Sequence, residues 1–159
     1  MLVTSWRMMN NGHYMRLLGM TALSFVSMYV FMYAMVDRFA NVYPNLNQFY
    51  MAGLMTAPMV LIELALMGAM YPNKTLNIII AALSGLALIA FLFLVRQQTA
   101  VFDMQFLKSM IPHHAGAVLM CERASLQDAE IRQLCNTILS GQQSEIDQMK
   151  AILNRLESQ

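Results

Sequence analysis

The stretch Leu76–Val95, LNIIIAALSGLALIAFLFLV, decides the fold, because 20 consecutive residues carry no charge. A hydrocarbon core about 30 Å thick is crossed by about 20 apolar residues in a helix. Two runs of similar length precede it, Leu17–Val36 and Phe49–Met70, the second interrupted by Pro58 and Glu63. The sequence therefore predicts an all-α protein with three transmembrane helices.

Charge divides the chain into two parts. Hydrophobic residues reach 58% and charged residues only 12%, against a usual value of about 25% charged. Between Leu17 and Val95 the charged residues are Asp37, Arg38, Glu63 and Lys74. The sequence after Val95 has the composition of a water-exposed amphipathic helical segment. We expect a membrane domain at residues 1–96 and an extramembrane helical hairpin at residues 97–159.

The net charge argues against a nucleic-acid-binding protein, and the first apolar run argues against a cleavable signal peptide. A net charge of +1 offers no basic surface for nucleic acid. The first run is too long for a cleavable signal peptide and lacks a small-residue exit. Cationic residues divide almost evenly between the two sides of the membrane, so they barely favour an orientation. We expect the amino terminus in the cytoplasm and the hairpin outside, mainly because of the family resemblance given below.

Two helices are predicted after the third span. We expect that span to continue as one rod through Gln97–Ile111, kinked at Pro112 and ending near Arg123. Ser125 resembles an N-cap for a last helix from about Gln127 to about Leu156. The short connection between them predicts an antiparallel hairpin.

Each hairpin helix carries a stripe at heptad-like spacing that we expect to be buried. The first stripe is Asp103, Phe106, Met110, His113, Ala117 and Met120. The second stripe is Ile131, Cys135, Ile138, Gln142, Glu145, Met149, Ile152 and Leu156. Antiparallel closure places Met110 near Gln142 and Cys135 opposite Ala117, so an intrachain disulfide with Cys121 is not expected. Because one hairpin buries little surface, we expect two copies to pair into a four-helix bundle, or the hairpin to dock on other protein.

The segment Met110-Ile-Pro-His113-His114 is the predicted metal site. Imidazole with thioether favours copper, especially Cu(I), over Mg²⁺ or Ca²⁺. The predicted ligands are His113, His114, Met110 and Met149, and the supporting or alternative ligands are Asp103, Glu145, Gln142 and Met104. Adjacent helical residues point about 100° apart, so both histidines face one point only if Pro112 distorts the helix. The alternative is a structural His pair, hydrogen-bonded at an interface.

Methionine is unusually frequent, at 17 residues, and forms a stripe in the second span. Met51, Met55, Met59, Glu63 and Met67 follow each other at intervals of four. A carboxylate deep in a bilayer costs roughly 2–4 kcal/mol, which makes Glu63 a functional candidate. The stripe predicts an intramembrane path for Cu(I), analogous to the eukaryotic high-affinity copper transporters. The alternative, which we favour for the stripe, is helix packing by Met with a protonated, hydrogen-bonded Glu63.

The hairpin resembles the bacterial domain-of-unknown-function family 305. The shared pattern is Asp103, Phe106-Leu107, Met110-Ile111-Pro112-His113-His114 and Ala117-Val118, followed by Gln142, Glu145-Ile146 and Met149. The resemblance implies a ferritin-like helical fold on the extracytoplasmic side, with copper binding and copper tolerance in some members. It implies the metal role of His113, His114, Met110 and Met149, supported by Asp103 and Glu145. Longer members carry two hairpins, and the single hairpin here favours a dimer.

Three functions follow as hypotheses. The first is a copper-binding protein of the bacterial inner membrane that sequesters or hands over copper on its periplasmic side. The second is a copper transporter that uses the Met and Glu63 stripe. The third is an accessory subunit of a larger membrane complex, with a structural His pair. No nucleophile–base arrangement or phosphate loop is present, so an enzyme is not expected.

Overall fold

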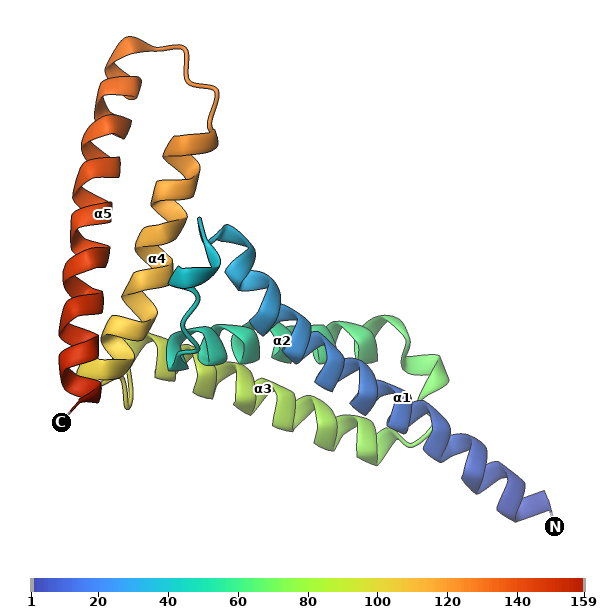
Figure 1. Cartoon of the computed structure of the whole chain (residues 1–159). Coiled ribbons are helices and arrows are strands. Elements are labelled where there is room, and N and C mark those ends of the chain that lie inside the picture. Colours follow the sequence, from blue (N-terminus) through green and yellow to red (C-terminus); the bar gives the residue numbers. More distant parts are fainter. Residues whose placement is uncertain (1, 159) are drawn as a thin grey trace. The chain divides into compact units, whose positions relative to one another are not determined.

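The computed structural model describes residues 2–158, with side chains described from Gly12 onward, and these residues form helices and no strand (Figure 1). The α-helices are α1 (Leu2–Phe31), α2 (Leu46–Leu66), α3 (Lys74–Gln97), α4 (Asp103–Arg123) and α5 (Ala129–Glu157). Short 3-10 helices are Met32–Met35, Phe39–Asn41 and Gly68–Met70. The chain forms two compact units. One contains α1 and Phe49–Thr99, and the other contains Met32–Gln48, α4 and α5.

The three predicted spans are confirmed by length and composition. The segments Gly12–Met35, Leu46–Leu66 and Lys74–Gln97 are helical and apolar enough to cross a membrane. Their bounds lie within five residues of the predicted ones. Pro58 lies inside α2. The chain is thus an all-helical protein with three helices able to span a bilayer.

The first unit packs through small residues of α2. Ala52, Gly53, Thr56 and Ala57 are buried, and small side chains let membrane helices approach closely. The ring of Phe91 from α3 covers Gly53 so closely that an added Cβ would overlap it. The Tyr50 hydroxyl donates a hydrogen bond of 2.8 Å to the Thr99 carbonyl. These contacts hold α2 antiparallel to α3.

The predicted continuous rod from α3 into α4 is wrong. The α3 helix ends at Gln97, and Gln98 adopts a left-handed conformation with φ of 51°. The backbone N–H groups of Gln98 and Thr99 both donate to the Leu94 carbonyl, which is a helix-ending arrangement. Ala100 follows with φ of 58°, and α4 starts at Asp103. Residues other than glycine rarely adopt the left-handed conformation that ends a helix. The end of α3 at Gln97 was therefore not predicted from the sequence.

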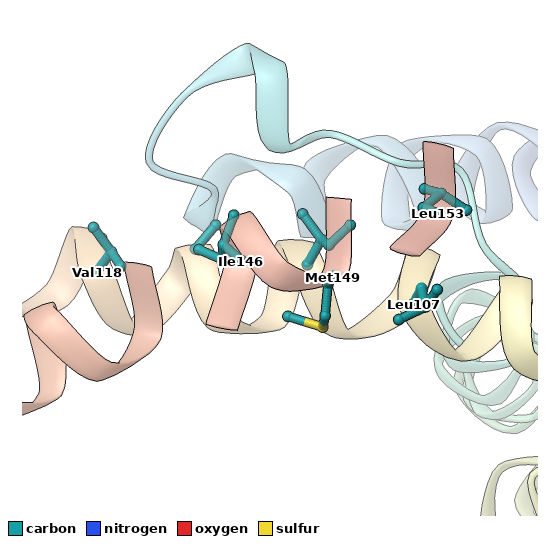
Figure 2. Close-up of a cluster of buried hydrophobic side chains, with 7 residues drawn as sticks. Leu107, Val118, Ile146, Met149 and Leu153 are labelled. Carbon is teal, nitrogen blue, oxygen red and sulfur yellow. The ribbon is translucent and has the colours of Figure 1, made fainter. Parts of the chain in front are cut away.

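The α4 and α5 helices form the predicted antiparallel hairpin, lying side by side (Figure 1). The core between them consists of Leu107, Ile111, Ala115, Val118, Ile146, Met149 and Leu153 (Figure 2). The α4 helix ends near the predicted Arg123 and continues through Pro112. The α5 helix begins two residues later than expected, because Asp128 caps it by accepting from the backbone N–H groups of Glu130 and Ile131. An arrangement as half of a ferritin-like bundle stays a prediction.

The buried face of α4 differs from the predicted stripe. Leu107, Ile111, Ala115 and Val118 point into the core, whereas Phe106 is 50% exposed and Met120 is 60% exposed. Both faces of α4 are apolar, so helical periodicity could not choose between them. On α5 the stripe is partly right, since Met149 is buried and Ile152 and Leu156 pack against the core. Glu145 and Ile131 are exposed.

A disulfide joins Cys121 of α4 to Cys135 of α5. The expectation of no intrachain disulfide is therefore wrong. Residues 124–128 lie outside any helix, so the connection is wider than the predicted tight turn. The wider connection moves the register by about one helical turn. This shift brings Cys121, rather than Ala117, opposite Cys135.

The segment Met32–Gln48, called the connector here, packs along α4 within the second unit. Val36 and Tyr43 join the hairpin core. The Leu46 backbone N–H donates a 3.0 Å hydrogen bond to Gln105 Oε1. At the other end, the Met35 carbonyl oxygen lies 3.6 Å from the position that a Cβ on Gly116 would take. The hairpin is thus covered on one side by its own chain.

Candidate functional site

The two adjacent histidines occupy different environments. The His114 side chain is only 12% exposed, on the side of α4 that faces α5, whereas His113 is exposed. Their ring centroids are 6.1 Å apart, with planes inclined at 63°. Since metal–nitrogen bonds are about 2 Å long, two imidazoles on one ion have centroids within roughly 6 Å. The observed separation of the two rings is therefore at the upper end of this range.

His114 has a partner at each ring nitrogen. Nδ1 lies 2.9 Å from the Met110 carbonyl oxygen, and Nε2 lies 2.9 Å from Glu145 Oε2. A neutral imidazole has one N–H donor, so a ring that donates from Nδ1 to Met110 presents a lone pair at Nε2. A doubly protonated ring donates to both oxygens. The same geometry therefore serves a proton-bearing ion pair or a metal-binding nitrogen with a carboxylate beside it.

The structure brings some of the predicted ligands together and leaves others apart. Met110 is half-buried against the hairpin core, and Gln142 is half-buried on α5. Met149 is 9% exposed and lies in the core (Figure 2). Asp103 and Met104 are exposed in the first turn of α4, and Asp103 is about 16 Å along the helix from His114. The cluster is therefore His114, Glu145 and the Met110 carbonyl, with His113 beside it.

The described residues hold no group of three or more His, Cys, Asp or Glu side chains placed to bind one ion. The pair His114 and Glu145 supplies one nitrogen and one oxygen donor. Copper accepts imidazole together with carboxylate or thioether. A metal here would complete its coordination with His113, a methionine, water or a donor from another molecule.

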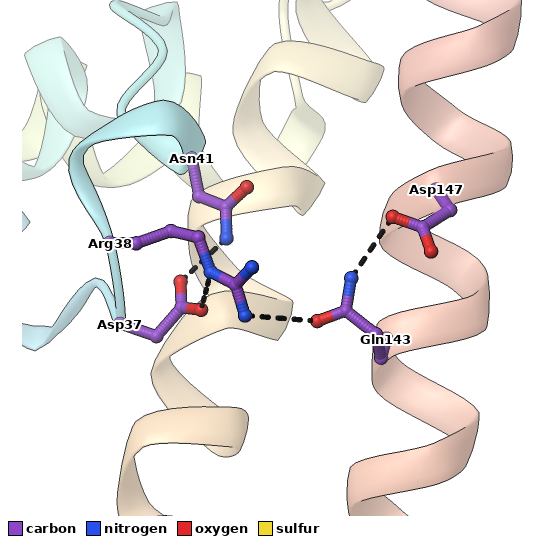
Figure 3. Close-up of polar contacts among 5 residues, drawn as sticks. All are labelled: Asp37, Arg38, Asn41, Gln143 and Asp147. Atoms are coloured by element: carbon purple, nitrogen blue, oxygen red, sulfur yellow. Dashed lines mark hydrogen bonds and ion pairs between the residues drawn. The ribbon is translucent and has the colours of Figure 1, made fainter.

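A second polar cluster links the connector to α5 (Figure 3). The Asp37 carboxylate is only 3% exposed and accepts hydrogen bonds from Arg38 Nε at 2.7 Å and Asn41 Nδ2 at 2.5 Å. Arg38 Nη2 donates to Gln143 Oε1 at 3.4 Å, and Gln143 Nε2 donates to Asp147 Oδ1 at 3.0 Å. This chain of contacts holds the connector against the hairpin.

Hydrogen bonding sets the pKa of Asp37. Burial alone would raise the pKa of this carboxyl, but the hydrogen bonds from Asn41 and Arg38 outweigh it and hold the pKa below its ordinary value. This cluster was not predicted from the sequence. Its available signal was a pair of opposite charges, Asp37 and Arg38, isolated between two apolar runs.

The methionine stripe of α2 lies partly on the surface of its unit. Met51, Met59 and Glu63 are half-buried, while Met55 and Met67 are each 41% exposed. A cavity of about 610 Å³ lies between α1, α2 and α3, and its lining among the described residues includes none of these five. The Tyr71 hydroxyl donates a hydrogen bond of 3.0 Å to Glu63 Oε1. Burial of the Tyr71 side chain, and to a smaller extent this hydrogen bond, raises the pKa of Tyr71. A metal path along the stripe stays a prediction.

Comparisons with known proteins identify two matches. The family described as Domain of unknown function (DUF305) matches residues 82–153, which include both histidines and Glu145. The uncharacterized protein L153 of Acanthamoeba polyphaga mimivirus is 33% identical over 155 residues. That alignment covers 95% of this chain and 97% of the viral protein, so it includes the three apolar spans. No solved structure matches the chain.

Proposed function

The chain belongs to the family of the domain of unknown function 305, and from that membership we propose that it is a membrane-anchored copper-binding protein. Its hairpin binds copper and either sequesters it or hands it to another molecule. The observation that carries the proposal is the environment of His114. Its Nδ1 is oriented by the Met110 carbonyl, and its Nε2 is presented to Glu145. A ring nitrogen held by a backbone carbonyl is the usual arrangement of a metal-binding histidine.

Copper suits the side chains near His114. In this proposal His114 Nε2 and Glu145 are donors, and His113 is the additional donor within reach. Imidazole and carboxylate are suitable ligands for Cu(II). A change of the Met110 rotamer that brings its sulfur to the ion would favour Cu(I). In this proposal the metal ion occupies the position between His114 Nε2 and the Glu145 carboxylate.

The disulfide supports an extracytoplasmic hairpin. Disulfides form and persist in oxidising compartments and are rare in the cytosol, and Cys121–Cys135 lies in the hairpin. Three spans place the two ends of the chain on opposite sides of the membrane. We therefore propose that the hairpin faces the oxidising side, with the amino terminus in the cytoplasm. In a bacterium this is the periplasmic face of the inner membrane.

Copper binding by the purified full chain tests the proposal. The parent is titrated with Cu(II), and with Cu(I) against a competing chelator, beside His114→Ala, Glu145→Gln and His113→Ala. His13→Ala is the matched control, because His13 is the remaining histidine and lies on α1. We expect His114→Ala to lose copper and His13→Ala to keep it. Equal binding by His114→Ala and the parent would make the assignment wrong.

One observation favours a second candidate, a structural role in a larger membrane complex. The 2.9 Å contact between His114 Nε2 and Glu145 Oε2 itself links α4 to α5. In that case the parent binds no copper in either oxidation state. His114→Ala then lowers only the melting temperature, and a partner protein co-purifies in a mild detergent.

A further inference from the structure

The three helices of the first unit form the walls of an apolar pocket. Its volume is about 610 Å³, within the range of roughly 300–1,000 Å³ that is usual for small-molecule sites. The described lining consists of residues within 14–26 of α1, 53–60 of α2 and 80–91 of α3. Natural protein interiors are close-packed, and their empty spaces seldom exceed a water molecule. A pocket of this size therefore indicates a ligand.

The threonine hydroxyls on the pocket wall are already bonded within their own helices. Thr21 Oγ1 donates a 2.8 Å hydrogen bond to the Leu17 carbonyl, and Thr56 Oγ1 donates a 2.8 Å hydrogen bond to the Ala52 carbonyl. Each hydroxyl has a single proton, so neither threonine offers a donor to a ligand. Apart from Ser84 and one tyrosine, the rest of the described lining is apolar. The pocket therefore suits a hydrocarbon chain better than a ligand that needs several hydrogen bonds.

Phe25 and Phe91 lie at one end of the pocket. Both rings pack against the ring of Phe49, with centroid distances of 5.0 Å and 6.3 Å. The wall that α3 contributes extends from Ile80 to Phe91, which is about 16 Å along the helix axis. The hydrocarbon core of a bilayer is about 30 Å thick and is shared by two leaflets, so one acyl chain occupies about 15 Å. The pocket is therefore about as deep as one acyl chain of one leaflet.

Tyr14 and the start of α3 form the opposite, polar end of the pocket. The Tyr14 hydroxyl donates a 2.7 Å hydrogen bond to Asn77 Oδ1 and accepts a 3.2 Å hydrogen bond from the Asn73 backbone N–H. Asn73 is the N-cap of α3, so this end of the pocket lies where the helix begins. A helix that crosses a bilayer begins and ends near the headgroup region. The polar end is thus where the headgroup of a bound lipid would lie.

The charged residues at this polar end are mainly cationic. Lys74 begins α3, and Arg16 is two residues after Tyr14. Both cationic side chains are exposed. Glu63 is the only acidic residue in the sequence of the first unit, and its Oε1 accepts the hydrogen bond from Tyr71. Lysine and arginine at a membrane surface attract anionic lipids, so this end complements a negatively charged headgroup.

We propose that this pocket binds one acyl chain of an anionic phospholipid, with the lipid phosphate at Arg16 and Lys74. The chain lies between the three helices and ends against Phe25 and Phe91. Its hydrocarbon supplies the contacts that the facing helix surfaces do not make with one another, so the lipid stabilises the first unit. The pocket lies wholly within this unit, so the proposal does not depend on copper binding by the hairpin.

Native mass spectrometry of the full chain tests the proposal, after release from nanodiscs that contain phosphatidylglycerol and phosphatidylcholine in equal amounts. Ala87→Phe on α3 and Ala22→Phe on α1 each place a ring in the pocket, from two different walls. Ala90→Phe is the matched control, because Ala90 is exposed on α3 and outside the described lining. The melting temperature of each variant in detergent shows whether it folds, and a filled variant that does not fold leaves the other to give the answer.

We expect the parent and Ala90→Phe to retain one phosphatidylglycerol per chain, and the two filled variants to retain severalfold less. Equal retention by the parent and a folded Ala87→Phe or Ala22→Phe would overturn the proposal. A parent chain that carries no lipid would also overturn it, because the helices then close the pocket themselves. A lipid-free dimer would show that a second copy of the chain fills the pocket, and the proposal would again be wrong.

A second set of variants tests the headgroup. Arg16→Gln combined with Lys74→Gln removes the two cations, and Arg96→Gln is the matched control in the last turn of α3. We expect the parent and Arg96→Gln to bind phosphatidylglycerol severalfold more than phosphatidylcholine, and the double variant to bind the two lipids about equally. Equal binding of the two lipids by the parent, or an unchanged preference in the double variant, would make the anionic headgroup assignment wrong.

Discussion

Removing the disulfide is expected to loosen the end of the hairpin that contains Cys121 and Cys135. The bond joins residues 14 apart in sequence. Closing a loop of that length removes chain entropy from the opened state worth roughly 3 kcal/mol at 25 °C. A double change of Cys121→Ala with Cys135→Ala should therefore destabilise the docking of α5 on α4 by about that amount.

The structure shows why the loss should be local. The buried core of the hairpin extends from Leu107 to Val118 on α4 and from Ile146 to Leu153 on α5. Beyond that core, Ile131 and Leu134 are each about half exposed. The disulfide is thus the main restraint on the first turns of α5, and its loss should leave the core end packed.

Hydrogen exchange on the full chain, measured by mass spectrometry in detergent or nanodiscs, resolves this difference. Because each 1.4 kcal/mol is a factor of ten, amides in residues 129–138 should exchange roughly 100-fold faster, and those in residues 146–153 much less. Reduction of the parent by a thiol should give the same pattern. An acceleration below about fivefold at residues 129–138, or an equal change in α3, would refute the reasoning.

The remaining predictions concern other positions. Gly53→Ala is expected to lower the melting temperature in detergent, because the added Cβ would overlap the ring of Phe91. Gly116→Ala should leave the melting temperature unchanged, because a Cβ there makes only ordinary contacts. Equal changes in melting temperature for the two variants would contradict the close packing of Phe91 on Gly53. Ala100→Gly should stabilise the chain by about 1 kcal/mol, seen as a higher melting temperature, because φ of 58° is strained for an L residue. The lowered pKa of Asp37 contributes stability above its unfolded pKa near 4, and acidification through the folded pKa removes it. Connector amides should then exchange faster below about pH 4, and a flat profile, or the same pH dependence in Asp37→Asn, would contradict this.

Apolar length made the spans predictable, and periodicity made the hairpin predictable. Twenty uncharged residues admit few structures other than a membrane helix, so Leu76–Val95 identified α3. Periodicity could not choose a face on α4. The stripes that contain Phe106 and Leu107 are both apolar, and packing against α5 and the connector selected the one with Leu107. The stripe with Phe106 was correctly recognised as apolar, but the prediction that it is buried against α5 was wrong.

The sequence predicted which residue types meet between the hairpin helices, but it did not predict their register. Glu145 was identified as a supporting residue, and the structure places it on His114 Nε2. Met149 was identified as a ligand, but it is one turn along from Glu145 on a face that turns into the core. The difference arises from the wide connection at residues 124–128. No local signal fixes the length of such a connection, and a shift of one turn changes which side chains meet.

The division of the hairpin site between two helices makes it sensitive to their spacing. His114 comes from α4 and Glu145 from α5, so their 2.9 Å contact depends on how the helices pack. The disulfide fixes the spacing at one end, and the core with Leu153 fixes it at the other. Arg38 of the connector bonds to Gln143, which lies half a turn from Glu145 on α5. Within the second unit the connector, the core and the disulfide therefore together hold the position of Glu145 relative to His114.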